Sequence, residues 1–480
     1  MLTTCCNTNP SVLNLFQLPS KRLSRFVRLA VLVITCLTSV SRTAGQNFKL
    51  MRFDEDYSGL KDSTRNFYRK IKYTSLSKDG NAYVSFGGAA RMEYVDFNNE
   101  DWGRLGIGYN SFLLQRYDLH ADLHLHERFR IFAQVRSAWE SGRKNGPRAI
   151  DEDNLNIQNL FIDAAIIKNK AQQLTLRAGR QELDYGSGRL ISVREGPNLR
   201  LYFDGAKLMY NTARWSIDGF VMMADTINTG AFDNKSSKAV NLWGLYSKIN
   251  IPAFPNIDVY YIGIKRDRSL FEEGANKELR HTAGTRIWRY GSGFIYNLEA
   301  AYQFGSFGNG RINAWTASVE AGYLFENIPG KPAISLRNDY ISGDRNKGDG
   351  HLQSFNPLYP KGGYFGFSPQ IGPVNLIDLH PYATVNIGKK ILAQADVVLN
   401  WRYSLQDGIY RPSGGFNLSG ASSSERHIGT AYLASFVYSM NKFISLNCGF
   451  QYFKTGAFIR DVIATPRDGL FINTRVSVKF

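Results

Sequence analysis

The sequence lacks long hydrophobic runs and contains few cysteines. After residue 45, no apolar run approaches the ~20 residues that a transmembrane helix requires, so a helical membrane protein is excluded. Three of the four cysteines lie within the first 45 residues, which leaves Cys448 alone in the remainder of the chain. No intrachain disulfide can form there, so a disulfide-stabilised scaffold is excluded as well.

The first 45 residues also lack any acidic residue. Four cations precede the apolar run Leu29 to Val40, and Thr43-Ala44-Gly45 supplies small residues before Gln46. This layout is typical of a secretory signal peptide, and the run is too short to cross a bilayer as a helix. Thr35 before Cys36 fits a lipoprotein cleavage site poorly. We expect a signal peptide over 1–45, a periplasmic N-terminal segment over 46–80 and a β-barrel over 81–480.

The chain without that segment is basic and rich in aromatic residues. It keeps 53 of the 58 basic residues against 41 acidic ones, and the whole sequence contains 26 Tyr, 31 Phe and 44 Gly. A polar average combined with many aromatic residues suits a barrel whose outer face meets lipid and whose inner face meets water.

Alternating hydrophobicity is clearest in the last eleven residues, LFINTRVSVKF. Leu470, Ile472, Val476, Val478 and Phe480 share one face of a strand, since strand side chains alternate with a period of two. The segments 116–126, 292–305 and 391–404 repeat the pattern. The sequence supplies no helices to cover these apolar faces in water, whereas in lipid they need no cover.

Counting such segments predicts an all-β fold, a transmembrane antiparallel β-barrel of about eighteen strands. The predicted strands are 82–97, 108–126, 129–140, 157–168, 172–183, 203–211, 214–223, 238–250, 257–266, 280–289, 292–305, 312–325, 332–342, 375–387, 391–404, 427–440, 442–455 and 469–480.

The links between the predicted strands alternate in length. Those after even strands are short, as at Glu127-Arg128, and those after odd strands are longer, up to the 32 residues between Ser342 and Asn375. This alternation is typical of a barrel in the outer membrane of a Gram-negative bacterium with both termini in the periplasm. The partners expected are outer-membrane lipid and the barrel-assembly machinery, which would recognise the C-terminal strand ending in Phe480. A monomer is expected, and no nucleic-acid partner.

Two blocks resemble a known family. They are RAGRQELDYGSGRL (Arg177 to Leu190), followed by Phe203-Asp204-Gly205, and SGDRNKGDGHLQSFNPLYPKGGYFG (Ser342 to Gly366). Together they resemble the alginate export family of Gram-negative outer-membrane barrels. The resemblance implies an 18-stranded monomeric porin with an electropositive conduit for an acidic polysaccharide. Family membership alone does not fix the substrate.

An alginate-like chain carries one carboxylate per sugar, so a selective pore needs cations spaced along its wall. Arginine suits this task because its planar fork binds carboxylates bidentately and stays protonated. Extending the alternation of each strand gives the following candidate lumen residues: Arg91, Arg116, Arg130, Arg136, Arg177, Arg286, Arg337, Arg402, Arg475 and Lys479. The same faces carry acids, and Arg91 with Glu93 and Arg337 with Asp339 could pair along a strand. Either these arginines select anions or they neutralise inward acids and order the wall.

A weak calcium-loop candidate follows the strand 332–342. Asp344, Asn346 and Asp349 lie among glycines, but the second Asp comes one residue late for the usual motif, which favours a glycine-rich turn. The aromatic loop from Ser342 to Asn375 is expected to pack against the rim or to fold inward as a constriction. No other metal and no cofactor is expected.

Three functions remain open. The first is a channel for an acidic, alginate-like polysaccharide or its oligosaccharides, and the second is a general or anion-selective diffusion porin for small solutes. No predicted periplasmic turn is long enough to be a plug, although the segment from Asn47 to Gly80 could reach the periplasmic mouth. The remote third alternative is an outer-membrane barrel enzyme, which lacks support because no Gly-x-Ser-x-Gly motif occurs and no catalytic residues stand out.

Overall fold

The structure is a computed structural model that describes residues 48–61, 67–252, 254–367 and 370–480. The predicted signal peptide lies outside these described residues. No helix within the described ranges is long and apolar enough to cross a membrane.

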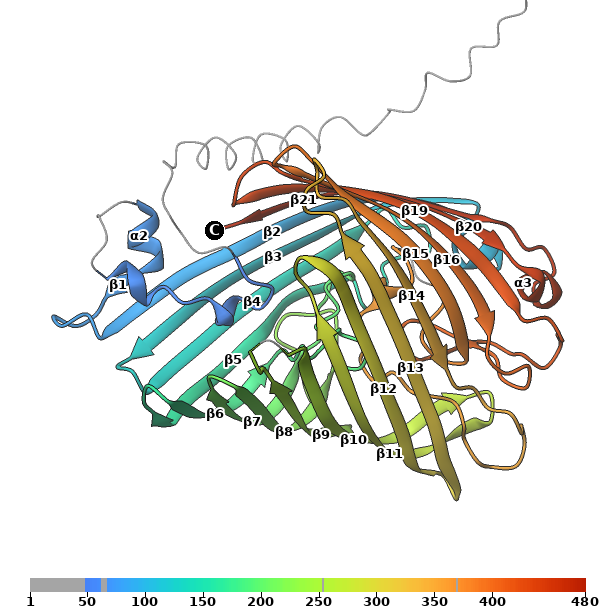
Figure 1. Ribbon diagram of the computed structural model, residues 1–480, viewed down its shortest axis with the longest axis horizontal. Coiled ribbons are helices and arrows are strands. Elements are labelled where there is room, and N and C mark those ends of the chain that lie inside the picture. The colour runs from blue at the N-terminus through green and yellow to red at the C-terminus, as the bar shows by residue number, and fades with distance from the viewer. Residues whose placement is uncertain (1–47, 62–66, 253, 368–369) are drawn as a thin grey trace, which may run out of the picture. The chain divides into compact units, whose positions relative to one another are not determined.

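Eighteen antiparallel strands form a closed barrel (Figure 1). Each strand pairs with the next in the chain, and the last pairs with the first, from Ala89 opposite Lys479 to Asn98 opposite Leu470. The barrel strands are β2 (Ala82–Asn98), β3 (Tyr109–Leu125), β4 (Phe129–Ser141), β5 (Asp153–Lys168), β6 (Gln172–Gln181), β7 (Phe203–Thr212), β8 (Trp215–Thr226), β9 (Lys235–Ile249), β10 (Asn256–Phe271), β11 (Gly274–Arg289), β12 (Gly293–Phe307), β13 (Gly310–Leu324), β14 (Ala333–Ile341), β15 (Leu376–Ile387), β16 (Ile391–Arg402), β19 (His427–Ser439), β20 (Ile444–Thr455) and β21 (Gly469–Lys479).

The strand count is confirmed, but the expected alternation of link lengths is wrong in one part of the barrel. Only Glu272 and Glu273 separate β10 from β11, and only Gly308 and Asn309 separate β12 from β13. The strands there keep pairing as hairpins beyond the predicted ends, so residues assigned to loops are paired instead. Gly274 and Gly308 have positive φ values of 120° and 56°, which tight turns of this kind require.

The outer face of the barrel wall is apolar, as a lipid-facing surface should be, and the inner face is polar. Apolar side chains such as Leu119, Val221 and Ile334 are 58%, 61% and 61% exposed, whereas inward neighbours such as Asp118 and Gln303 are buried. Because the closed sheet satisfies every backbone hydrogen bond along the ladder, its apolar outside can face hydrocarbon without an unpaired edge.

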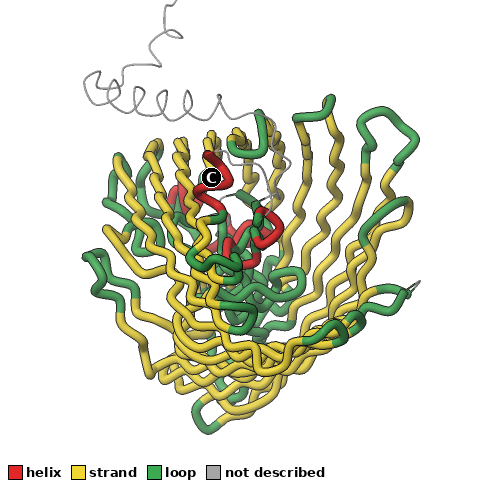
Figure 2. Tube along the Cα trace, turned by 90° about the vertical axis from the view of Figure 1, so that its left-hand side faces the viewer, coloured by secondary structure: helices red, strands yellow, loops and turns green. Residues whose placement is uncertain are grey.

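Long links run within the ring of strands (Figure 2). The links are β6–β7 (182–202), β14–β15 (342–375), which contains η4 (Gly362–Tyr364), and β16–β19 (403–426), which contains the hairpin β17 (Ile409–Tyr410) and β18 (Phe416–Leu418). Side chains of these links, among them Leu183, Phe355 and Tyr410, share one buried apolar cluster with the inner wall. These links therefore occupy part of the barrel interior.

Short elements flank the barrel strands. η1 (Arg52–Asp54), η2 (Ser58–Leu60), α2 (Phe67–Lys72) and β1 (Thr74–Ser75) precede β2, and β1 pairs with it. η3 (Glu100–Gly103) lies in the β2–β3 link and α3 (Ala457–Val462) in the β20–β21 link.

Candidate functional site

The ten predicted cations all lie on barrel strands, on the face that carries buried polar side chains. Six are buried, namely Arg91, Arg116, Arg136, Arg177, Arg286 and Arg402. The other four are half-buried, namely Arg130, Arg337, Arg475 and Lys479. All ten therefore lie on the inner face of their strands, and their role in a substrate path stays a prediction.

Most of these arginines bind carboxylates of the same wall. Two nitrogens of Arg177 donate to the two oxygens of Asp163 at 2.7 and 2.8 Å, and Arg130 binds Asp122 over the same distances. The remaining pairs are Arg136–Asp118 at 2.7 Å, Arg286–Asp258 at 3.1 Å, Arg337–Glu320 at 3.1 Å and Arg475–Glu93 at 2.7 Å. Such pairs cancel most of the charge that the arginines alone would give the lumen.

The pairing partners differ from those expected along single strands. Glu93 binds Arg475 on β21 rather than Arg91, and Asp339 binds Arg189 of the β6–β7 link rather than Arg337. The reason is geometric. Glu93 and Arg475 are directly opposed on neighbouring strands, where side chains lie about 4.5–5.5 Å apart at Cβ, closer than residues two positions apart on one strand. Asp339 is instead reached by Arg189 from the inward link.

Three of the predicted cations hold inward links in place. Arg91 donates to the carbonyl oxygens of Glu195 at 2.8 Å and Pro197 at 2.9 Å, and Arg116 pairs with the Glu195 carboxylate. Arg402 donates to five carbonyl oxygens of the β16–β19 link, those of Leu405, Asp407, Gly420, Ser423 and Glu425. Lys479 forms no ion pair with the described residues.

Glu195 is the acid at the centre of this arrangement. Burial alone would raise the pKa of its carboxyl, but the guanidinium groups of Arg116, Arg200 and Arg91 hold that pKa well below its usual range. Glu195 therefore stays ionised and fastens the β6–β7 link to β2 and β3.

The β6–β7 and β14–β15 links meet inside the barrel. Ile191 and Tyr359 form a parallel bridge, with the Ser192 N–H donating to the Tyr359 carbonyl at 2.9 Å and the Tyr359 N–H to the Leu190 carbonyl at 2.8 Å. The expectation that the loop from Ser342 folds inward is confirmed, since Phe355 and Leu358 are buried there. The inward course of 182–202 was not predicted, although its apolar residues Leu183, Tyr185, Leu190 and Ile191 are a signal that could have shown it.

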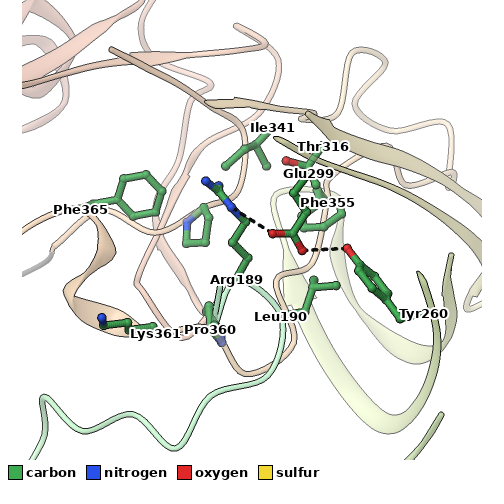
Figure 3. Close-up of a pocket in the computed structure, with 12 residues that line it drawn as sticks. Arg189, Leu190, Tyr260, Glu299, Thr316, Ile341, Phe355, Pro360, Lys361 and Phe365 are labelled. Carbon is green, nitrogen blue, oxygen red and sulfur yellow. Dashed lines mark hydrogen bonds and ion pairs between the residues drawn. The ribbon is translucent and has the colours of Figure 1, made fainter. Parts of the chain in front are cut away.

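Arg189 ties this pair of links to the far wall, in a pocket between the links and strands β10, β12, β13 and β14 (Figure 3). Its guanidinium lies 3.3 Å from the Glu299 carboxylate on β12 and pairs with Asp339 on β14. Glu299 also accepts hydrogen bonds from Tyr260 at 3.0 Å and Ser187 at 2.6 Å. The β6–β7 link is thus fastened at both sides of the lumen.

Two cations lie beside Tyr359 where the two links meet, and we call Arg194 and Arg266 the constriction cluster. The guanidinium carbons of Arg194 and Arg266 lie 5.9 and 5.7 Å from the centre of the Tyr359 ring. Arg194 donates to the Pro360 carbonyl at 3.3 Å, and Arg266 lies 3.4 Å from Glu278, which also pairs with Arg280. Among the described residues, Arg194 and Lys361 have no carboxylate within ion-pair distance.

Local geometry and electrostatics distinguish Arg194. Its φ of 53° is left-handed, a conformation that non-glycine residues adopt rarely and that is often retained at functional sites. Burial, with a smaller contribution from Arg266, lowers the pKa of Arg194 to about 10, so it remains charged at neutral pH. Within the constriction cluster, Arg194 therefore offers positive charge that no carboxylate of the described residues neutralises, whereas Arg266 is paired with Glu278.

The calcium-loop candidates do not converge. The Asn346 N–H donates to the Asp344 carboxylate at 3.1 Å in a local turn, whereas Asp349 accepts from the His351 N–H at 2.8 Å. In the described part of the chain, no group of three or more His, Cys, Asp or Glu side chains is placed to hold a metal ion. The glycine-rich turn is the arrangement observed.

Comparison with known proteins gives the family and the fold. The alginate export family profile matches residues 82–471. OccAB1 of Acinetobacter baumannii is 12% identical with a TM-score of 0.56, covering 86% of this chain and 99% of its own. OccD3 (OpdP) of Pseudomonas aeruginosa is 10% identical with a TM-score of 0.56, covering 91% and 100%. OpdO of Pseudomonas aeruginosa is 10% identical with a TM-score of 0.55, covering 83% and 97%.

No curated protein sequence matches the chain. At these identities the structural likeness shows the fold alone, an 18-stranded outer-membrane barrel, whereas the profile match covers most of the chain. Family and structural neighbours are transport channels rather than enzymes. The chain therefore belongs to the alginate export family and is an outer-membrane β-barrel porin.

Proposed function

We propose that this porin passes an acidic, alginate-like polysaccharide or its oligosaccharides across the outer membrane, with both termini in the periplasm. The observation that carries the proposal is the constriction cluster, in which Arg194 and Arg266 flank Tyr359 where the two inward links meet. The orientation is supported by the short links at the end of the barrel that carries both termini, such as those between β3 and β4 and between β15 and β16.

Most wall arginines are paired with carboxylates, so we favour the constriction cluster over them as the element that selects anions. A uronate chain presents one carboxylate per sugar, and a guanidinium already bound to Asp163 or Asp122 adds little net positive charge to the lumen, although part of its N–H donors remains available. Arg194 donates to a carbonyl oxygen, and a carboxylate is the stronger acceptor for a guanidinium. Arginine and lysine side chains that line a pore are one way in which pores select anions.

A second candidate is an anion-selective diffusion porin for small solutes. The observation that favours it is the fastening of the β6–β7 link across the lumen, from Arg91 and Arg116 on one side to Glu299 and Asp339 on the other. A lumen crossed in this way admits small solutes more readily than a polymer.

The test is single-channel recording in planar bilayers under a salt gradient, with added tetrameric oligo-uronate. We expect the wild type to prefer anions and to be blocked by oligo-uronate, and R194Q/R266Q to need about tenfold more oligo-uronate for half block. The matched control is K389Q/K390Q, which removes two exposed cations from the β15–β16 turn. Cation selectivity without oligo-uronate block would contradict the uronate path, and block by small anions alone would favour the diffusion porin.

A further inference from the structure

The N-terminal segment 48–61 enters the barrel at the end that carries the termini. Phe53 is 3% exposed and lies between Phe132 on β4 and Phe161 on β5, which are also buried. Its ring meets both edge-on, with centroids 5.7 and 5.3 Å away, while Phe132 and Phe161 stack on one another at 5.4 Å. A residue that precedes the barrel therefore fills an aromatic recess of the inner wall.

Two of the predicted lumen arginines border the same recess. Arg130 donates to the Phe53 carbonyl at 2.6 Å, and the Arg177 guanidinium carbon lies 4.6 Å from the Phe53 ring centre and 3.8 Å from that of Phe161. Both arginines keep one edge on a wall carboxylate, Asp122 or Asp163. The remaining face of each is turned toward the N-terminal segment.

Beyond the Phe53 recess, side-chain hydrogen bonds and one ion pair hold the segment in place. Arg52 donates to the carbonyl oxygens of Gly88 at 3.0 Å and Phe480 at 2.8 Å and pairs with Glu55 at 2.7 Å. The Leu50 carbonyl accepts from Arg200 of the β6–β7 link at 3.0 Å. None of these bonds is part of the strand pairing that closes the sheet, so the segment can leave without opening the barrel.

We propose that Phe132, Phe161, Arg130 and Arg177 form a binding subsite for a uronate sugar, which Phe53 occupies when the segment is docked. This inference rests on the proposed function and names where its substrate binds. The aromatic faces suit the C–H face of a pyranose ring. The Arg130 N–H that now meets the Phe53 carbonyl would form a stronger, charge-assisted bond to a sugar carboxylate.

The docked segment and the sugar compete for one site, and this competition changes the apparent affinity for the sugar. The apparent affinity for the uronate is reduced by the fraction of channels in which the site is vacant. Removing the Phe53 ring should therefore tighten uronate block and raise the current together, whereas loss of a merely structural contact would not tighten block.

The experiment compares wild type, F53A and F67A in planar bilayers with added tetrameric oligo-uronate, with maltotetraose as the neutral probe. Phe67 is 73% exposed on α2 and serves as the matched control. We expect F53A to carry more current and to reach half block at about tenfold lower oligo-uronate, with maltotetraose and F67A giving no change. Because Phe53 lies outside the barrel strands, folding should be unaffected, as heat-modifiable migration in electrophoresis would verify.

The double variant F53A/R130Q tests the ligand chemistry. It should keep the raised current of F53A but lose the tighter block. If oligo-uronate blocks the wild type and F53A to the same extent, the subsite is overturned while the proposed function stands. If no channel is blocked although F53A raises the current, the proposed function and the uronate assignment both fall.

Discussion

At the scale of single residues, the buried side chain of Lys72 indicates how docking of the segment 48–61 depends on pH. Lys72 at the end of α2 is fully buried, and its ammonium lies 4.8 Å from the Tyr57 ring centre without a hydrogen-bond partner among the described residues. Burial, reinforced by Arg52, lowers the pKa of Lys72 from 10.5 to about 7, against the smaller opposing effects of Glu55 and Asp122. His120 and Tyr57 complete its surroundings.

The depressed pKa predicts a pH dependence of docking. Between pH 10.5 and 7, Lys72 binds a proton when the segment 48–61 is undocked and excludes it when the segment is docked, so docking weakens as the pH falls through this window and levels off below it. A dye on S58C in a C448S background would report docking through its fluorescence anisotropy. We expect K72M to stay docked across the range and K70M, an exposed neighbour on α2, to follow the wild type. A flat wild-type profile would contradict the prediction.

For the candidate site, the sequence predicts positions but not partners. Alternation alone placed Arg177 and Arg475 on the inner face, because a strand has only two faces. It could not show that Arg475 binds Glu93 or that Arg130 meets the Phe53 carbonyl, since these contacts join residues 382 and 77 positions apart. The sequence does not indicate Arg194 and Arg266 for the same reason, because they lie beside Tyr359 only where the two links meet.

At the scale of elements, the strands were predictable and the links were not. Each barrel strand, such as β3 or β16, repeats one simple two-faced pattern imposed by lipid and lumen, so periodicity suffices to find it. An inward link such as 182–202 is fixed by contacts with distant strands, and its own sequence has no period. The hairpin β10–β11 was underestimated because its pairing continues beyond the strand ends predicted from alternation.

At the scale of elements, the prediction concerns Arg189, which fastens the β6–β7 link. R189A removes the bonds to Glu299 and Asp339 that fasten the β6–β7 link to the far wall. Amides of 183–202 should then exchange with deuterium faster, since local opening depends on such tertiary contacts, by about tenfold or more. R345A, an exposed arginine of the β14–β15 link, is the control. Unchanged protection in R189A would mean that the bridge between Ile191 and Tyr359 holds the link by itself.

At the scale of the whole molecule, the barrel depends on one seam between its first and last strands. β21 ends beside Gly88, where the Gly88 N–H donates to the Phe480 carbonyl at 3.1 Å and the Phe480 N–H to the Gly88 carbonyl at 3.0 Å. Arg52 donates to the same two carbonyl groups, so the seam and the docked N-terminal segment share acceptors. The contact that docks the N-terminal segment and the contact that closes the sheet therefore lie at the same place.

Gly88 provides the test of this seam. A Cβ there would lie 2.6 Å from the Asp118 carbonyl oxygen and 2.7 Å from the Phe480 ring, so neither backbone nor ring could accommodate it without a shift. G88V should cost about 1–3 kcal/mol of strain at the seam and reduce the fraction of chain that folds into vesicles, read from heat-modifiable migration in electrophoresis. Gly219 on β8 is the matched control, because its Cβ would meet only the Leu245 side chain at 3.8 Å. Equal folded fractions of G88V and G219V would show that β2 and β21 close the barrel without the close approach of Phe480. Closure of the sheet would then not depend on the place where Arg52 docks.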